Sequence, residues 1–281
     1  MSRLMRRDSR VQILLHGLLV CLFVIWGYPV VWTLTSSLKA SGDLYSAPWS
    51  LPDPAHFENI AHAWVQGQLG QAFLNSAYVT AVSVSLILLF AVPAAFGFAR
   101  LRLPFPAVLG LAILVPLMIP SEVILVPLFV MFRALGLLNT LEGLIMLEVA
   151  GGVAFATVVL TTFFRGVPRE LEDAARIDGA RSVQVLWHII LPLAGPGIAA
   201  VAVFQSVFVW NDYFAPLIVI QKPSLFTVQL AIGNFSNFYT TDESLLFAGL
   251  ALAMLPPLVV VAVLQRYLIQ GFKKTVGALR D

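Results

Sequence analysis

The sequence has very little charge. Only 11% of its 281 residues are Asp, Glu, Lys or Arg, whereas 59% are hydrophobic. A soluble domain of this length needs far more polar and charged side chains at its surface. The composition therefore excludes a soluble globular protein and predicts a chain embedded in lipid.

Cysteine is almost absent as well. The single cysteine, Cys21, lies inside an apolar stretch. One cysteine excludes a disulfide framework and a cysteine-based metal site, and its position predicts a small apolar core residue. His56 and His62 are the other candidate metal ligands, but no further ligand type lies near them. We therefore predict no metal site.

A nucleotide-binding loop is also missing. No Gly-x-x-x-x-Gly-Lys-Ser/Thr pattern occurs in the chain, and Lys274-Thr275 lacks the preceding glycines. We expect no cofactor on this polypeptide. If its work is driven by ATP, a partner subunit must bind the ATP and the Mg²⁺.

Long apolar stretches, by contrast, are abundant. A bilayer core about 30 Å thick needs roughly 20 apolar residues per helical crossing. Six stretches without Lys or Arg meet this need, and the first is too long for a cleaved signal peptide. We predict an all-α membrane protein with six transmembrane helices, at residues 12–38, 72–98, 104–132, 143–164, 196–220 and 245–264.

The cations lie in the connections and are unequally divided. With six crossings both termini lie on one side, and that side has fourteen of the 17 Lys and Arg residues, whereas the other has three. This positive-inside asymmetry predicts cytoplasmic termini in the cell (inner) membrane, and it explains the net charge without a nucleic-acid partner. The fourteen are Arg3, Arg6, Arg7, Arg10, Arg100, Arg102, Arg165, Arg169, Arg176, Arg181, Arg266, Lys273, Lys274 and Arg280, and the three are Lys39, Arg133 and Lys222.

One membrane domain over residues 1–281 fits these patterns, because no repeat, low-complexity tract or soluble domain is evident. Its cytoplasmic parts are an N-terminal segment (1–11), a segment between the fourth and fifth helices (165–195) and a C-terminal tail (265–281). On the other side, residues 39–71 are polar and rich in turn residues, with a short interfacial helix expected over 58–64.

The cytoplasmic segment 165–195 has the pattern of two short helices. Pro168 suits a helix start, acidic residues follow it, and Gly179 suits a left-handed C-terminal cap. Leu171, Ala174 and Ala175 form a narrow apolar stripe. A second helix is expected over 183–190, after a capping Ser182 and before Leu191-Pro192. From these residues alone, an amphipathic pair on the lipid headgroups and a docking site for a partner protein are equally good interpretations.

The order of motif residues in this segment favours the second interpretation. Asp173-Ala174-Ala175, Gly179 four positions later, Ile189 and then Leu191-Pro192 closely resemble the cytoplasmic coupling motif of ABC importer permeases. The resemblance extends over nearly the whole chain and is strongest to the carbohydrate (maltose-type) branch. Its further elements are Ser37-Leu-Lys39, Asn75-Ser76, Ala99-Arg100, Leu137-Leu-Asn-Thr140, Phe163-Phe164, Trp210-Asn-Asp212 and Gln265-Arg-Tyr267.

The resemblance implies a role for the segment as a coupling helix that sits in a cleft of an ATP-hydrolysing subunit. The chain departs from the family pattern at Asp173, where Glu is usual, and in its last residues. The implied coupling residues are Glu170, Asp173, Ala174, Ala175, Asp178, Gly179, Ile189, Leu191 and Pro192. The implied partners are a second homologous permease, two ATPase subunits, an extracytoplasmic solute-binding protein, a sugar substrate and membrane lipid.

Polar residues inside the apolar stretches are candidates for the translocation path, because they are costly there. They are Glu122, Glu148, Gln205, Asn211 and Asp212. Gln205 and Asp212 are seven positions apart, so on one helix they would share a face and jointly bind a hydroxyl-rich solute. The alternative is that these residues pair with neighbouring helices or cap helix breaks.

We therefore predict a non-catalytic permease subunit of an ATP-driven ABC importer for a sugar or oligosaccharide. Two alternatives within transport are an importer of glycerol phosphate, a polyol or another solute, and an ion-coupled secondary transporter. The second would need inverted repeats and paired buried carboxylates, which are not evident. A membrane-embedded enzyme would need a convergent acid/base or metal cluster, which the scattered carboxylates do not supply.

Overall fold

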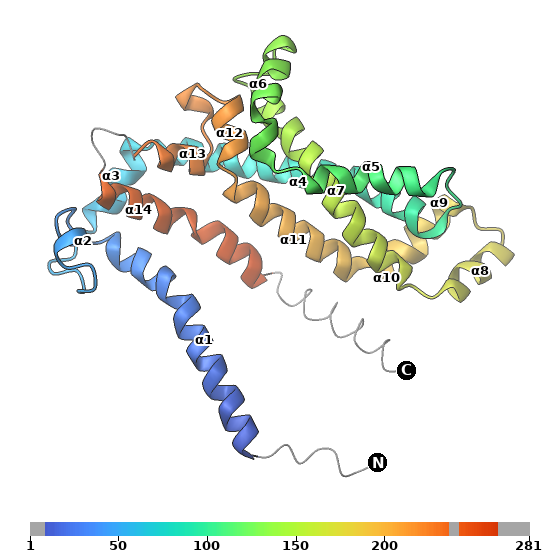
Figure 1. Cartoon of the computed structure of the whole chain (residues 1–281), viewed down its shortest axis with the longest axis horizontal. Helices are drawn as coiled ribbons and strands as arrows, with labels where there is room; N and C mark the ends of the chain where they lie inside the picture. Colours follow the sequence, from blue (N-terminus) through green and yellow to red (C-terminus); the bar gives the residue numbers. More distant parts are fainter. Residues whose placement is uncertain (1–8, 236–241, 264–281) are drawn as a thin grey trace. The chain divides into compact units, whose positions relative to one another are not determined.

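The computed structural model describes residues 9–235 and 242–263, and all regular secondary structure in these residues is helical. They belong to two compact units, Met1–Leu69 with Ile232–Ala253, and Gly70–Ala231 with Met254–Asp281. The predicted tail (265–281) and residues 1–8 of the predicted N-terminal segment lie outside the described residues. Figure 1 gives the element labels used below.

The first unit is built around one long helix. It contains α1 (Ser9–Ser36), α2 (Asp43–Ser46), α3 (Glu58–Gln66) and α14 (Glu243–Ala253). α14 packs against α1 and α3, and Trp32 meets Phe247 edge to face with ring centroids 5.1 Å apart. The short helix expected over 58–64 is thereby confirmed as α3.

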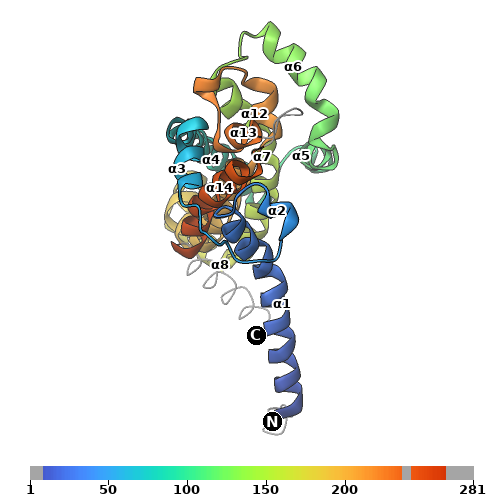
Figure 2. The ribbon, with the colours of Figure 1, turned by 90° about the vertical axis from the view of Figure 1, so that its left-hand side faces the viewer.

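Most of α1 has no neighbour within its unit. Figure 2 shows it extending away from α2, α3 and α14, and its apolar side chains are exposed along most of its length. Cys21 is among the exposed residues, so the expectation of a core position for it is wrong for the isolated chain. An apolar helix with bare faces needs lipid or another protein around it.

The second unit contains the other helices, apart from residues at its boundaries. Three of them, α4, α7 and α11, carry most of its core. The elements are α4 (Leu69–Arg100), α5 (Pro106–Met118), η1 (Ser121–Ile124), α6 (Leu125–Ala134), α7 (Leu141–Arg165), α8 (Arg169–Ile177), α9 (Ser182–Val185), η2 (Leu186–Ile190, a π-helical turn), α10 (Leu191–Leu193), α11 (Gly195–Asn211), α12 (Phe214–Val219), η3 (Pro223–Leu225) and α13 (Val228–Gly233).

Four helices are long and apolar enough to cross a bilayer, namely Val11–Ser36, Leu69–Arg100, Leu141–Arg165 and Glu243–Val263. A fifth crossing results if Ser182–Leu193 and Gly195–Asn211, which are bent by 76° at their junction, count as one span. The described residues thus give four to five candidate spans, whereas the sequence predicts six continuous ones.

The predicted third span, residues 104–132, is the main difference. It consists of α5 and α6, which are separated by Ile119, Pro120 and η1. Ile119 is extended (φ −93°, ψ 120°), as expected before a proline, and Pro120 cannot donate a helical hydrogen bond. Figure 1 shows α5 and α6 running in different directions. Each is about 15–20 Å long, too short to cross a bilayer alone.

The predicted fifth span, residues 196–220, is also interrupted. α11 ends at Asn211, because Asp212 adopts an extended conformation (φ −69°, ψ 131°). The Asp212 side chain then accepts hydrogen bonds from the backbone N–H groups of Phe214 (2.9 Å) and Ala215 (3.4 Å). Asp212 therefore caps α12 and does not share a helix face with Gln205.

Small residues allow the helices of the second unit to pack closely. Ile87, Ala91 and Ala95 of α4 meet Ala156 and Leu160 of α7 in a buried cluster. A Cβ atom on Gly152 would overlap Ile87, and one on Gly197 would overlap the ring of Phe163. In lipid the hydrophobic effect does not drive helices together, so their association depends on close packing at small residues such as these.

Two polar motifs fasten loops to this core. Asn75 donates to the carbonyl oxygens of Ser224 and Phe226, both at 3.0 Å, and the Ser76 hydroxyl accepts from Val228 N–H at 2.9 Å. These motifs therefore hold the chain before α13 against the start of α4.

Candidate functional site

The helix that carries the predicted coupling motif is specified at both ends by its own residues. α8 begins directly after Pro168, with Glu170 and Glu172 in its first turn, where acids oppose the positive end of the helix dipole. At its other end Gly179 has φ +86°, and the Ala180 N–H donates to the Ala175 carbonyl at 2.9 Å. This left-handed glycine cap is the one that the sequence predicts.

The two faces of α8 differ sharply. Glu172 is buried and Ala175 packs partly against the core. Asp173 and Ala174 are exposed, and so are Leu171 (46%) and Ile177 (86%). The predicted apolar stripe is therefore split, because Ala175 faces the bundle while Leu171 and Ala174 face outward. We call Leu171, Asp173, Ala174 and Ile177 the coupling face.

The second short helix runs further than its sequence suggests. α9, η2 and α10 continue without a break from Ser182 to Leu193. Pro192 does not end the helix, because it directly follows the π-helical turn η2, where the regular α-helical hydrogen-bond ladder is already interrupted. The capping position before this helix is held by Arg181 and not by Ser182. The Arg181 N–H donates to the Gln184 side chain at 2.8 Å. Ile189 and Leu191 pack partly against the core.

A buried ion pair fastens α8 to the bundle. The Nε atom of Arg100, the last residue of α4, contacts the Oε1 atom of Glu172, and the two side chains are only 3% and 6% exposed. The Nη2 atom of Arg100 also donates to the carbonyl oxygens of Phe164 (2.6 Å) and Val167 (2.5 Å). One guanidinium therefore joins the ends of α4 and α7 to α8.

The predicted path residues are not gathered at one point. Glu122 lies in η1. Gln205 is buried, and its amide donates to the Gly152 carbonyl of α7 at 3.0 Å. Asn211 is exposed at the end of α11 and accepts from the Gln229 side chain at 3.3 Å. Their role in translocation stays a prediction.

Asp212 and Glu148 do lie together. Glu148 of α7 is buried, and its carboxyl group interacts with that of Asp212. Because Asp212 also caps α12, this contact brings the start of α12 against α7. The sequence identifies both residues as intramembrane acids but does not indicate that they meet.

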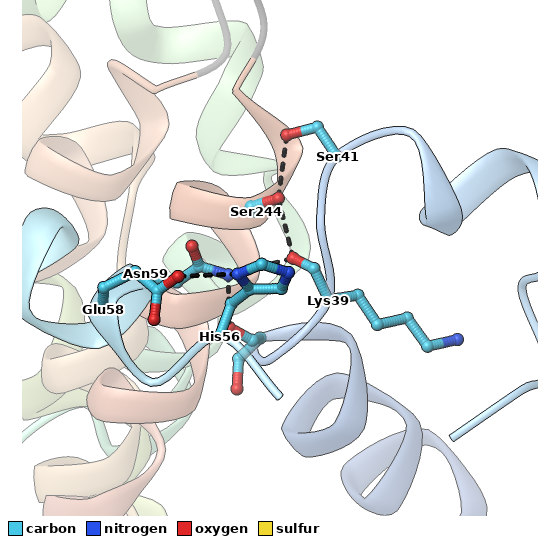
Figure 3. Close-up of polar contacts among 7 residues, drawn as sticks. Lys39, Ser41, His56, Glu58, Asn59 and Ser244 are labelled. Carbon is cyan, nitrogen blue, oxygen red and sulfur yellow. Dashed lines mark hydrogen bonds and ion pairs between the residues drawn. The ribbon is translucent and has the colours of Figure 1, made fainter. Parts of the chain in front are cut away.

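A second polar cluster lies in the first unit around Lys39, which is 1% exposed. Its ammonium donates to the carbonyl oxygens of Ala47 (3.0 Å) and Pro48 (3.1 Å). Its own carbonyl accepts from Asn59 (2.9 Å) and from the Ser244 hydroxyl (3.1 Å). Figure 3 shows this cluster joining α3, α14 and the chain after α1.

The roles of Arg100, Glu172 and Lys39 are not evident from sequence reasoning. Arg100 and Lys39 are part of the family resemblance, and that is the only signal that singles them out. Among the described residues, no group of three His, Cys, Asp or Glu side chains is arranged to hold a metal ion. The arrangement as a whole presents an exposed face of α8, a short helix that Arg100 ties to the ends of α4 and α7.

Comparison with known proteins gives the family. Residues 87–274 match the family described as "Binding-protein-dependent transport system inner membrane component". The chain is 36% identical to the diacetylchitobiose uptake system permease protein NgcG of Streptomyces coelicolor over 261 residues, which are 92% of this chain and 86% of the relative. It is 32% identical to the melibiose/raffinose/stachyose import permease protein MelC of Bacillus subtilis, with 98% of both chains covered.

The fold also matches solved structures. A chain from a bacterial ABC transporter involved in the import of the acidic polysaccharide alginate superposes with a TM-score of 0.76 at 22% identity, covering 93% of this chain and 98% of that one. A chain of the MetNI methionine ABC transporter gives a TM-score of 0.62 at 16% identity, covering 72% and 95%.

Proposed function

Because the chain belongs to the family of inner membrane components of binding-protein-dependent transport systems, we propose that it is the permease subunit for an oligosaccharide in an ABC importer. The subunit itself is non-catalytic: it forms a passage across the membrane, and a partner hydrolyses ATP. The observation that carries the proposal is the exposed coupling face on a helix whose opposite face is tied to α4 and α7 by Arg100.

The class of cargo is supported by the named relatives. Besides the diacetylchitobiose and melibiose/raffinose/stachyose permeases, the chain is 31% identical to the trehalose transport system permease protein SugB of Mycobacterium tuberculosis, over 90% of its length. All three names specify a di- or oligosaccharide. A neutral sugar also suits an interior with few charges, because it needs hydrogen-bonding groups and no counter-ion.

In the assembled importer the chain crosses the membrane six times, with α5 to α6 as a broken third crossing and both termini in the cytoplasm. Such a break is tolerated where the freed backbone is covered by protein or lines a cavity. The cation asymmetry of fourteen to three among 17 Lys and Arg residues supports this orientation. α8 then lies on the cytoplasmic side.

The coupling face docks on one of two ATPase subunits. Glu170 at the start of α8 and Gly179 just after its end flank this face, and Ile189, Leu191 and Pro192 support it from the next helix. The small side chain of Ala174 permits close approach of the ATPase, Ala175 lets α8 lie close to the bundle, and Asp173 and Asp178 present negative charge to the ATPase. A second, homologous permease covers part of the bare surface of α1, and a binding protein delivers the sugar.

Among the predicted path residues, Asn211 is the one that we propose for contact with the solute. Its side chain is exposed, whereas that of Gln205 is not. The Asn211 amide nitrogen donates to the Val207 carbonyl and its oxygen accepts from Gln229, which leaves the second N–H and the second lone pair of the oxygen for a sugar hydroxyl. Glu122 belongs to the turn between the two halves of the third crossing, and we propose that this turn borders the passage.

Uptake by whole cells tests the cargo. A strain of the source organism that lacks this gene is compared with the parent for uptake of ¹⁴C-labelled di- and trisaccharides, glycerol 3-phosphate and a polyol. We expect saccharide uptake to fall at least tenfold and to return with the wild-type gene. Loss of glycerol phosphate or polyol uptake alone would make that solute the cargo.

A variant of the coupling face tests the mechanism. Ala174→Arg places a long cation on an exposed site, whereas Ala174→Ser keeps the side chain small. We expect the Arg variant to lose uptake and the co-purified ATPase, and the Ser variant to keep both. Normal uptake by the Arg variant that a protonophore abolishes would instead indicate an ion-coupled transporter.

A further inference from the structure

Only one buried ion pair occurs in the part of the chain that the structure describes, and it does not belong to the predicted coupling motif. Glu172 precedes Asp173, the first motif residue, yet the two adjacent acids lie in opposite environments. The Glu172 side chain is 6% exposed and contacts Arg100, while Asp173 is exposed on the coupling face. Burying a charge is costly unless a partner compensates it. The pair is therefore expected to have a specific role at this place in the fold.

Arg100 is positioned to connect three elements at once. Its backbone ends α4, and its Nη2 atom binds the carbonyl oxygens of Phe164, near the end of α7, and Val167, in the turn before α8. Its Nε atom contacts Glu172 on α8. The planar guanidinium holds its Nη2 and Nε groups in a fixed relation to each other, whereas an ammonium is a compact charge with freely rotating donors.

Other contacts of α8 with the bundle are weak by comparison. Leu171 and Ile177 point away from it, and Ala175 offers one methyl group to the core. The connections before and after α8 are short, with Gly166, Val167 and Pro168 on one side and Gly179 to Arg181 on the other. The Arg100–Glu172 pair is therefore the main side-chain link between α8 and the membrane helices.

We propose that Arg100 and Glu172 are positioning residues for energy coupling: they transmit the displacement of α8 by the ATPase to the ends of α4 and α7. This inference rests on the proposed function, in which α8 docks on the ATPase. Without the pair, α8 still docks, because the coupling face is intact. Its movement is then taken up by the connections before and after α8, and ATP is hydrolysed without transport.

The test compares the purified importer, reconstituted in proteoliposomes with its binding protein, as wild type, Glu172→Gln and Arg100→Lys. Glu172→Gln keeps the shape and removes the charge; Arg100→Lys keeps the charge and removes the planar fork. The matched controls are Glu142→Gln, an exposed acid at the start of α7, and Arg102→Lys, an exposed arginine two positions after Arg100. The readouts are sugar molecules imported per ATP hydrolysed and the amount of ATPase bound.

We expect both pair variants to retain bound ATPase and hydrolysis within about twofold, while sugar imported per ATP falls at least tenfold; the controls keep the wild-type ratio. An unchanged ratio in the pair variants would overturn the proposal. Loss of the ATPase or of folded protein in Glu172→Gln would overturn it too, because the pair would then serve assembly alone.

The Ala174→Arg variant separates this inference from the proposed function. If Ala174→Arg keeps its ATPase and its uptake, α8 is not the docking helix and the proposed function fails. If Ala174→Arg loses the ATPase while the pair variants keep a normal ratio, only the inference about Arg100 and Glu172 fails.

Discussion

The amide of Gln205 on α11 donates a hydrogen bond of 3.0 Å to the backbone carbonyl of Gly152 on α7. The contact is possible because Gly152 has no side chain: a Cβ atom there would lie 3.3 Å from the Gln205 amide nitrogen and would overlap Ile87 of α4. Three helices therefore meet at one glycine, and Gln205, a predicted path residue, takes part in their contact.

The first prediction concerns the packing at Gly152. Gly152→Ala should destabilise the subunit by about 1–3 kcal/mol, because the methyl group forces Ile87 or the helices apart. Gly151 is the matched control, since a Cβ atom there would meet nothing within 4 Å. Gly151→Ala should be neutral or stabilising by up to about 1 kcal/mol. Thermal unfolding of the detergent-solubilised protein measures both, and equal midpoints would contradict this packing.

The second prediction separates a structural amide from a solute-binding one. Gln205→Leu should lower stability by about 0.5–2 kcal/mol, as expected for an interhelical hydrogen bond in a membrane, without changing KM for sugar uptake. Asn211→Ala should raise that KM with little effect on stability, because Asn211 is exposed. A raised KM for Gln205→Leu alone would assign the solute contact to Gln205.

The third prediction concerns the end of α8. Gly179 has φ +86°, and a Cβ atom there would meet no neighbour within 4 Å, so any effect of substitution comes from the backbone. Gly179→Ala should cost about 1–2 kcal/mol of local stability and Gly179→Val more, whereas Gly179→Asn should be best tolerated. Sugar uptake should fall in the same order. Equal uptake by all three variants would mean that the left-handed cap is dispensable.

The fourth prediction concerns Lys39. Lys39→Met should remove the charged donor from the carbonyl oxygens of Ala47 and Pro48, which keep only Ser50 and Trp32 as donors. The expected cost is about 1.5–3 kcal/mol, as for hydrogen bonds to a charged group. Hydrogen exchange of residues 40–50 should become faster. Lys222→Met, which replaces an exposed lysine, should leave that exchange unchanged. Slow exchange in Lys39→Met would show that other contacts hold this segment.

The fifth prediction is a pH dependence next to α3. A hydrogen bond of 2.6 Å from the His56 ring lowers the pKa of Glu58 below its ordinary 4.5. The hydrogen bond therefore stabilises the folded protein at pH values above the ordinary pKa of Glu58. This stabilisation is lost as the pH falls through the lowered pKa of Glu58. His56→Ala should raise the pKa of Glu58, measured by ¹³C NMR of labelled Glu. His62→Ala should raise it less, because His62 acts only through a weak charge interaction.

Local signals were sufficient to predict some elements. The bounds of α8 follow from Pro168, the acidic first turn and Gly179, all of which act within a few residues of the helix. The apolar stretches that became α1, α4 and α7 are long and uninterrupted, so their period and length identify them. The resemblance gives the family because its motif residues occur at fixed spacings.

Features that depend on distant partners were not predictable in this way. Nothing near Glu172 tells that it faces inward while Asp173 faces outward, because this depends on where Arg100 ends α4. The break at Pro120 is visible in the sequence, but hydropathy measures the length of an apolar stretch and not its direction. Asp212 was expected on a helix because apolar residues of the stretch 196–220 continue on both sides of it, whereas its side chain caps the next helix.

The exposure of Cys21 has a practical consequence. The chain has no other cysteine, so a thiol-reactive probe added to the native sequence labels α1 alone, without any engineered substitution. We expect the thiol to react with a water-soluble reagent where α1 meets water and with a lipid-soluble reagent where α1 meets lipid. A neighbouring subunit that covers the thiol should protect it from both. The native residue can therefore report which surroundings α1 meets before and after the subunit joins its complex.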